Sequence, residues 1–382
     1  MRFRAERDAL VEAMSIAGRA AATRGGALPA LSGIRMELAG DRLHLAGSDL
    51  DLTVQVEMGV NGAEPGVCVV PARLATDIVR ALEPGGVTVS VEGGEATIAS
   101  GRSQFTVRVL PAEEFLRLPQ VTGDAVNLDG PSLVGALHQV VRAASKDDAR
   151  PILTGVLFEA EASGQGGPTA NADAATGLRL VSTDSYRLAL RDLPGTSLLA
   201  EGQHVLVPSR ALGELARVLS GADHVALRLG SDEASFSVGP EGGTTVRLTT
   251  RLLEGEFPNY RQLIPPHYPN RLTVAKTPFL DAVRRVKLLA RDAAPVRLSL
   301  RADAVELSAI TQDVGQARED VEAKYEGAEM VVAFNPEFLI DGVEACAGDE
   351  VVLETLDALK PATVRPVEGT DYLYLLMPVR VS

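Results

Sequence analysis

The feature of this sequence that most constrains its fold is an internal repeat with a period near 130 residues. The segment Val69–Leu82 returns as Leu206–Leu219, displaced by 137 positions, and each copy has the pattern of a strand end followed by a helix. A weaker third copy, Val332–Val343, follows about 127 positions later. Solenoid and propeller repeats run roughly 20 to 50 residues, so a unit of this length is itself a domain. The 382 residues are therefore predicted to form three similar domains in tandem.

Other segments repeat in step with the first. The stretch Ala27–Ile34 is echoed by Ala149–Val156. The stretch Leu43–Leu52 is echoed by Leu178–Leu188, with a third copy at Val305–Asp313. Repetition of several segments in the same order supports three homologous domains.

Loop-like segments at 118–125 and 254–259 separate the repeats. The predicted domains are accordingly 1–120, 126–254 and 255–382. Residues 163–177 are rich in Gly, Ala, Thr and Asn without periodicity, which predicts a flexible loop inserted in the second repeat.

Strand patterns dominate each repeat. Apolar and polar residues alternate in 51–57 and 104–109, as in half-buried antiparallel strands. Helical spacing appears in the Arg73 and Arg210 segments, and as an apolar stripe at Leu133, Val134, Leu137, Val140, Val141 and Ala144. Thr277 before Pro278 fits an N-cap and a first helical residue, which predicts a helix to about Arg291. The predicted fold class is α+β.

The composition, 46% hydrophobic and 23% charged, is typical of a soluble globular protein. No run approaches the roughly 18 apolar residues that a membrane span needs. The charged segment from Met1 lacks the features of a signal peptide, so we expect a cytoplasmic location. Cys68 and Cys346 lie in apolar or small-residue contexts and are predicted to be buried reduced thiols.

The net charge of −14 argues against a nucleic-acid partner unless the basic residues are segregated on one surface. Arg73 and Arg80 are two helical turns apart, with Asp77 on the same stripe, and Arg210, Glu214 and Arg217 repeat this arrangement. Basic residues also crowd the first helices of the second and third repeats, at Arg142, Lys146, Arg284, Arg285, Lys287 and Arg291. If the repeated units close into a ring with their helices inward, these basic groups would face a common hole, which would reconcile an acidic protein with a DNA partner. Ordinary solvated helix faces are the alternative.

The third repeat departs from this pattern. Its matching positions are Glu337, Asp341 and Glu344, and the sequence offers no physical account of the reversal.

Enzyme chemistry is not indicated. The five histidines, His44, His138, His204, His224 and His267, have no metal-ligand spacing, and there is no phosphate-binding glycine-lysine loop or nucleophile elbow. Asp49 and Asp184 recur after a strand in two repeats. A turn or capping role is favoured over a catalytic one. We therefore expect no enzyme activity, no cofactor and no metal. The alternative is an enzyme with an unrecognised hydrolytic site. Loss of a hydrolytic activity on mutation of either aspartate would support that alternative.

Several motifs are similar to those of one family. The opening Met1–Phe3, the turn Thr183–Leu188, the segment Phe257–Tyr260 and the C-terminal Tyr374–Val381 resemble the beta subunit of bacterial DNA polymerase III over essentially the whole chain. The resemblance implies three domains of the DNA clamp fold and a ring-shaped head-to-tail homodimer, with antiparallel sheets outside and two helices per domain inside. It also implies a processivity factor that encircles double-stranded DNA without sequence specificity. Because no nucleotide site is visible in the sequence, a separate ATP-driven loader would open the ring, and we expect no membrane partner.

In that family, polymerases, repair proteins and the clamp loader insert short linear peptides between the second and third domains. Carried over by position, the pocket comprises Leu153, Thr183, Ser185, Tyr186, Arg187, Leu188, Pro258, Leu263, Asn335, Phe338, Leu359, Pro361, Leu375, Leu376, Met377, Pro378, Val379 and Arg380. Aliphatic groups and a methionine suit an adaptable cleft for peptide side chains. The expected DNA-binding residues are Arg24, Arg73, Arg80, Arg142, Lys146, Arg210, Arg217 and Arg285. The expected subunit-interface residues are Phe105, Leu288 and Leu289.

Two departures keep an alternative open. The family often has Gly-His where this chain has Ser185-Tyr186, and two tyrosines where it has Pro151-Ile152. The altered rim and the acidic third-repeat helix motivate a specialised clamp paralogue or interaction scaffold that does not serve the main replicase.

Overall fold

The computed structural model describes residues 1–22, 28–115, 117–160, 177–196, 198–200, 202–219, 221–239, 243–290, 294–369 and 371–380. Of the predicted loop at 163–177, all but Gly177 lies outside these residues. The described chain forms two compact units, Met1–Pro131 with Ala211–Leu252, and Ser132–Arg210 with Leu253–Ser382. The middle repeat therefore contributes to both units.

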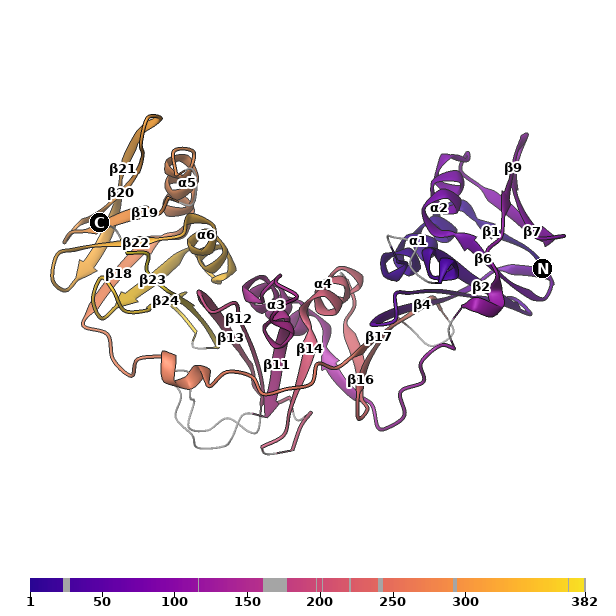
Figure 1. Cartoon of the computed structure of the whole chain (residues 1–382), viewed down its shortest axis with the longest axis horizontal. Coiled ribbons are helices and arrows are strands. Elements are labelled where there is room, and N and C mark those ends of the chain that lie inside the picture. Colours follow the sequence, from indigo (N-terminus) through magenta and orange to yellow (C-terminus); the bar gives the residue numbers. More distant parts are fainter. Residues whose placement is uncertain are drawn as a thin grey trace. The chain divides into compact units, whose positions relative to one another are not determined.

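All three repeats run through one order of elements: a strand, a helix, three strands, a strand, a helix and three strands (Figure 1). The first repeat holds β1 (Arg2–Glu6), α1 (Arg7–Ala17), β2 (Gly33–Ala39), β3 (Arg42–Ser48), β4 (Leu52–Gly59), an additional β5 (Asn61–Glu64), β6 (Gly66–Pro71), α2 (Ala72–Ala81), β7 (Gly86–Glu92), β8 (Glu95–Ser100) and β9 (Ser103–Arg108). The second holds β10 (Val126–Asp129), α3 (Gly130–Val140), β11 (Gly155–Ala160), β12 (Leu178–Thr183), β13 (Arg187–Leu193), β14 (His204–Pro208), α4 (Ser209–Val218), β15 (His224–Leu229), β16 (Glu233–Val238) and β17 (Thr245–Arg251). The third holds β18 (Asn270–Ala275), α5 (Lys276–Lys287), β19 (Val296–Leu300), β20 (Ala304–Thr311), β21 (Gly315–Glu326), β22 (Met330–Phe334), α6 (Pro336–Ala345), β23 (Glu350–Thr355), β24 (Ala362–Pro366) and β25 (Tyr372–Leu376).

The strands form antiparallel sheets that cross the boundaries between repeats. In the described residues a five-stranded sheet has the order β5-β1-β7-β8-β9, an eight-stranded sheet β10-β15-β16-β17-β4-β3-β2-β6, and a twelve-stranded sheet β14-β11-β12-β13-β25-β24-β23-β18-β21-β20-β19-β22. The second repeat joins the first through β17 and β4, with Leu248 opposite Val54. It joins the third through β25 and β13, with Tyr374 opposite Ala189. The predicted α+β fold of three similar domains is confirmed.

The helices form because their apolar residues recur at helical spacing and find a sheet to cover. In α2, Ala72, Ala75, Thr76 and Val79 are buried, while Arg73 and Arg80 face solvent. Helices α5 and α6 lie side by side on the strands of the third repeat (Figure 1). The predicted helices around Arg73, Arg210 and Leu133 are therefore confirmed.

The predicted limits of α5 were wrong. Its N-cap is Ala275 and not Thr277, so Thr277 and Pro278 lie inside the first turn. A proline is tolerated there because the first N–H groups of a helix have no intrahelical acceptor. The helix ends at Lys287, and Arg291 lies outside the described residues.

The strand predictions at 51–57 and 104–109 are confirmed in β4 and β9, but burial differs between them. In β4 the inward positions are buried, whereas Val107 is the one buried residue of β9. The reason is that β9 is the edge strand of its sheet. Phe105, an apolar position of this alternating pattern, is 42% exposed.

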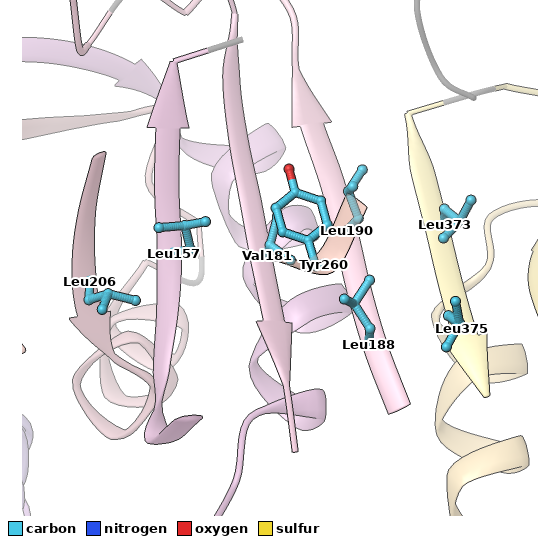
Figure 2. Packing of buried hydrophobic residues seen from close by; sticks show 8 residues of the cluster. All are labelled: Leu157, Val181, Leu188, Leu190, Leu206, Tyr260, Leu373 and Leu375. Carbon is cyan, nitrogen blue, oxygen red and sulfur yellow. The ribbon is translucent and has the colours of Figure 1, made fainter. Parts of the chain in front are cut away.

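A buried cluster spans the junction between the second and third repeats. Figure 2 shows its members on neighbouring strands and on the connecting segment: Leu157, Val181, Leu188, Leu190, Leu206, Tyr260, Leu373 and Leu375. Tyr260 belongs to the segment between the two repeats, and its hydroxyl donates to Glu159, which also accepts from Arg261. Burial raises the pKa of Tyr260, with the Glu159 charge adding to the effect. The two repeats therefore share one core beneath their common sheet.

Both cysteines are free and buried, as predicted. Burial raises the pKa of the Cys68 and Cys346 thiols to about 12. A thiol with such a pKa stays protonated at neutral pH and is a poor nucleophile.

Two helical glycines give a matched test of packing. A Cβ on Gly342 of α6 would lie 2.3 Å from Cδ1 of Tyr374, whereas a Cβ on Gly135 of α3 meets nothing within 4 Å. Alanine favours a helix over glycine by roughly 1 kcal/mol, but overpacking costs about 1–3 kcal/mol. We expect Gly342→Ala to lower the midpoint of denaturant unfolding and Gly135→Ala to raise it slightly. Equal shifts for the two variants would contradict the close packing of α6 on β25.

Candidate functional site

The turn between β12 and β13 is built by Asp184. Its Oδ1 accepts from the backbone N–H groups of Tyr186 at 2.9 Å and Arg187 at 3.0 Å. Ser185 has φ 80°, in the left-handed region that favours glycine. The turn leaves Tyr186 60% exposed, and the Tyr186 carbonyl accepts from the Met377 N–H at 2.9 Å. Met377 follows β25, so both residues lie at one end of the paired strands β13 and β25.

The same turn recurs in the first repeat. Oδ1 of Asp49 accepts from the N–H groups of Asp51 at 3.2 Å and Leu52 at 2.9 Å, and Leu50 has φ 88°. The predicted turn role of Asp49 and Asp184 is therefore confirmed. The described residues include no cluster of His, Cys, Asp or Glu that could hold a metal ion.

Arg187 connects this turn to the third repeat. It is buried, and its Nε donates to Asp184 Oδ2 at 3.0 Å and its Nη1 to Asp341 Oδ2 at 2.5 Å. Its Cζ lies 4.3 Å from the ring centroid of Phe338, within the range of a cation–π contact. Burial alone would lower the pKa of Arg187, but Tyr374, Asp341 and Asp184 raise it, so the guanidinium remains charged.

The acidic residues of α6 are paired within the molecule. Asp341 Oδ1 lies 3.4 Å from Arg142 Nη1, and Glu344 bonds Arg142 at 2.8 Å and Arg284 at 2.6 Å. Glu337 pairs with Lys287 at 2.5 Å. Burial alone would raise the pKa of Glu344, but hydrogen bonds from the two arginines hold it below the usual value. These contacts give the physical account of the acidic stripe that the sequence does not provide.

The residues expected to form the pocket divide by exposure. Four large groups are exposed: Tyr186 at 60%, Leu263 at 43%, Leu359 at 63% and Met377 at 38%. Ser185, Pro258 and Arg380 are also exposed, and the partly exposed members are Asn335, Phe338, Pro361, Pro378 and Val379. The buried members are Leu153, Thr183, Arg187, Leu188, Leu375 and Leu376. The exposed groups can contact a ligand directly, while the buried ones support them from below.

Sheet order brings much of this set together. Strands β12, β13, β25 and β24 are neighbours in the sheet, and Leu376 lies opposite both Arg187 and Ala362. The Asp184–Arg187 turn, Met377 and the segment before Ala362 therefore lie at the same end of these strands. Leu359 and Pro361 belong to that segment. Asn335 caps α6 by accepting from the N–H groups of Glu337 and Phe338, which fixes the helix start beside Arg187. The N–H of Val379 donates to the Ala333 carbonyl at 2.8 Å and fixes the final segment to β22.

A cleft of about 610 Å³ adjoins the turn. Its lining includes Tyr186, Arg187 and Phe338 from the expected pocket, and Lys146 and Arg150, which precede β11. Arg150 bonds Asp147 at 3.1 Å and the Ser185 hydroxyl at 3.3 Å. The sequence prediction missed Arg150 and the supporting role of Asp341. The signal for the second was an acid that recurs at this position in all three repeats, as Asp77, Glu214 and Asp341.

The residues expected to bind DNA are exposed wherever they are described, and Arg24 lies outside the described residues. Arg73 and Arg80 pair with Asp77 on α2, and Arg217 pairs with Glu214 on α4. Arg142 bonds Asp341 and Glu344, and Arg285 bonds Glu319 through Nε at 3.0 Å. Lys146 lines the cleft beside the turn.

The residues expected at a subunit interface lie on two surfaces. Phe105 is on the edge strand β9. Leu288 follows α5 and is 73% exposed, beside the partly exposed Leu289. Ile310 and Val314, at the end of the β20–β21 hairpin, are 55% and 50% exposed. Each surface offers apolar groups to solvent.

Comparison with known proteins gives one consistent family. Models of the DNA polymerase III beta subunit match in chain order: the N-terminal domain at residues 1–119, the central domain at 127–259 and the C-terminal domain at 261–380. A "Beta sliding clamp" of Streptomyces coelicolor is 37% identical, and one of Staphylococcus aureus is 30% identical, each over 100% of this chain and at least 99% of the relative.

Solved structures agree with the sequence matches. A DnaN sliding clamp (DNA polymerase III subunit beta) from Bartonella birtlesii, bound to griselimycin, has a TM-score of 0.90 at 31% identity and covers 100% of both chains. A beta sliding clamp of C. crescentus, with polyethylene glycol at its putative beta-motif tethering region, has a TM-score of 0.89 at 28% identity, covering 100% of this chain and 99% of that one. No helix in the described residues is long and apolar enough to cross a membrane. The chain therefore belongs to the DNA polymerase III beta subunit family, the non-catalytic sliding clamps that serve DNA polymerase as processivity factors.

Proposed function

We propose that two copies of this chain close head to tail into a ring around duplex DNA, and that polymerases, repair proteins and the clamp loader bind it by short peptides beside Tyr186 and Met377. The cytoplasm, where bacterial DNA is replicated, is the proposed location. The predicted domains 1–120, 126–254 and 255–382 are the proposed repeating units. The observation that carries the ring is a pair of strands, β9 and β21, whose counterparts pair at both junctions within the chain.

The pairing rule follows from the repeats. The last strand of each later repeat, β17 or β25, pairs with the fourth strand of the repeat before it, β4 or β13. The remaining last strand is β9, and the remaining fourth strand is β21. In the described chain, residues 315–322 of β21 pair with β20 on one side. On the other side, pairing with β18 involves only residues 323–326 of β21, so residues 315–322 have an open edge there. An open edge of matching length is thus available for β9 of a second copy.

The register of this contact can be derived. Phe105, Leu248 and Tyr374 hold equivalent positions in the last strands of the three repeats. They lie opposite Ile98, Phe236 and Val364, which are themselves equivalent positions of the preceding strands. Ala317 corresponds to Val54 and Ala189 by the same criterion. Since Leu248 lies opposite Val54 and Tyr374 opposite Ala189, Phe105 should lie opposite Ala317 of the second copy. Antiparallel pairing then puts Arg102 opposite Asp320.

A charge exchange tests this register. Like charges directly opposite each other destabilise a strand pair, so Arg102→Asp and Asp320→Arg should each weaken dimerisation about three- to tenfold, and the double variant should regain most of the loss. Sedimentation equilibrium at low protein concentration measures the dimer dissociation constant. Arg108→Asp is the matched control, because the register places Arg108 opposite the uncharged Val314. An equal effect of Arg108→Asp, or no recovery in the double variant, would contradict the register.

The proposed DNA contacts come from exposed helix arginines and not from sequence readout. Phosphate contacts through long, solvated side chains are non-specific and compatible with sliding. Arg73 is weakly held, with a side chain 97% exposed and the Asp77 carboxylate at 3.9 Å. Exposed pairs of this kind contribute roughly 0–1 kcal/mol and exchange readily for phosphate. Arg142 and Arg285 are held by closer carboxylates, so we assign them a smaller share.

The salt dependence of DNA binding should separate these groups. Each phosphate contact contributes about 0.9 to the slope of log affinity against log salt. We expect Arg73→Ala with Arg217→Ala to reduce the slope measurably for a closed ring on short nicked circles. Arg142→Ala should change it less. A larger loss for Arg142→Ala would show that the α6 carboxylates release that arginine to DNA.

Peptide binding is the direct test of the partner site. A fluorescent peptide carrying a polymerase-type clamp motif should bind saturably, and Met377→Ala and Leu359→Ala should each weaken binding about tenfold, since exposed anchor contacts are worth roughly 1–2 kcal/mol. Val367→Ala is the control, because Val367 is 37% exposed, close to the 38% of Met377, but lies outside the site. Leu188 is 0% exposed, so its truncation would lower the stability of the core and would not report on direct contact with the peptide.

The alternative function is a specialised paralogue that keeps the ring for different partners. The observation that favours it is Tyr186, which stands 60% exposed on the rim and reshapes the entry to the cleft. A closed ring that loads on DNA but does not bind the polymerase-type peptide would support the paralogue over the replicative clamp.

A further inference from the structure

We propose that Asp341 is a positioning residue for the partner site. Its carboxylate holds the Asp184–Arg187 turn of the second repeat against α6 of the third, so that two walls of the peptide cleft stand in place before a partner arrives. This inference rests on the proposed peptide site. Asp341 was not among the expected pocket residues, although it lines the cleft beside the turn.

The two oxygens of Asp341 bond different arginines of the second repeat. Oδ2 accepts from Arg187 Nη1 at 2.5 Å, and Oδ1 accepts from Arg142 Nη1 at 3.4 Å. Arg187 begins β13, and Arg142 lies just after α3. One carboxylate of α6 thus bonds two separate elements of the neighbouring repeat.

Arg187 transmits this constraint to the cleft. Beyond Asp341, it bonds Asp184 Oδ2 at 3.0 Å and the Tyr374 hydroxyl at 3.3 Å, and it stacks on Phe338 one turn before Asp341 on α6. Asp184 in turn fixes the backbone of Tyr186. Phe338 and Tyr186 both line the cleft, so Arg187 sets the separation of two lining residues from different repeats.

Contacts along α6 reinforce the same junction. Arg142 also bonds Glu344 at 2.8 Å, and Gln139 Nε2 donates to the Ala345 carbonyl at 2.9 Å. Both donors belong to the second repeat. The C-terminal half of α6 is therefore attached to the second repeat by side chains as well as by the β13–β25 sheet.

The junction between the first and second repeats provides an internal comparison. Arg19, which matches Arg142, bonds Glu214, which matches Asp341, at 3.1 Å. The arginine of the turn has no counterpart at this junction. Leu52 lies opposite Thr250 as Arg187 lies opposite Leu376, so Leu52 occupies the position of Arg187. The ion pair recurs at both junctions, whereas the link from the acid to the turn belongs to the junction that carries the peptide cleft.

The experiment compares Asp341→Asn with Glu214→Gln in the full-length dimer. Each variant removes one charge with little change in volume at matched positions. We expect Asp341→Asn to weaken binding of the labelled peptide about tenfold and to shift the methyl NMR resonance of Met377, whose N–H bonds the turn. Glu214→Gln should leave both unchanged, and Asp341→Glu should retain affinity within about threefold. Thermal unfolding of each variant establishes that it is folded.

The outcomes are distinct. Wild-type affinity and an unshifted Met377 resonance in Asp341→Asn would overturn the positioning role, as would an equal loss in Glu214→Gln. If the wild-type dimer binds no peptide, the proposed partner site fails, and the Met377 resonance of Asp341→Asn still decides whether Asp341 positions the turn.

Discussion

Strand pairing across repeat boundaries is the interaction on which the rest of this structure depends. Each of the two later repeats ends on a strand that pairs with the fourth strand of the preceding repeat, β17 with β4 and β25 with β13. Because backbone N–H and C=O groups are obligatory hydrogen-bonding groups, an edge left open favours another strand. In the described residues, β9 of the first repeat has one unpaired edge, and β21 of the third repeat has an unpaired edge over residues 315–322. The ring proposal follows from these two edges.

The side chains at equivalent junctions differ. Within the chain, an arginine after the first helix of one repeat meets an acid on the second helix of the next, as Arg19 with Glu214 and Arg142 with Asp341. At the matching position in the third repeat stands Leu288, 73% exposed. The proposed contact between copies therefore replaces an ion pair with apolar surface. Apolar burial is non-directional and tolerates the separation and reassociation that opening a ring requires, whereas a buried charge left without its partner is costly.

The same pairing accounts for the charge pattern of the helices. Among the described residues, the acid Asp77 on α2 pairs with Arg73 and Arg80 of its own helix, and both arginines remain at the surface. On α6 the whole stripe is acidic, and every member bonds a base of α5 or of the second repeat. Helix α6 is thus a structural element of the junction, and none of the proposed DNA contacts lies on it.

The sequence by itself determined the threefold repeat, several of its strands and helices, and the turn role of Asp49 and Asp184, because periodicity and side-chain type are local properties. It placed the start of α5 wrongly at Thr277, since capping depends on which backbone groups reach the helix end. Only the tertiary structure decided that Leu188 and Leu376 support the site from below while Met377 and Leu359 are exposed. Only it showed that Glu337, Asp341 and Glu344 neutralise basic residues far away in the chain. Both depend on which distant strands and helices meet, and the sequence pattern does not record those contacts.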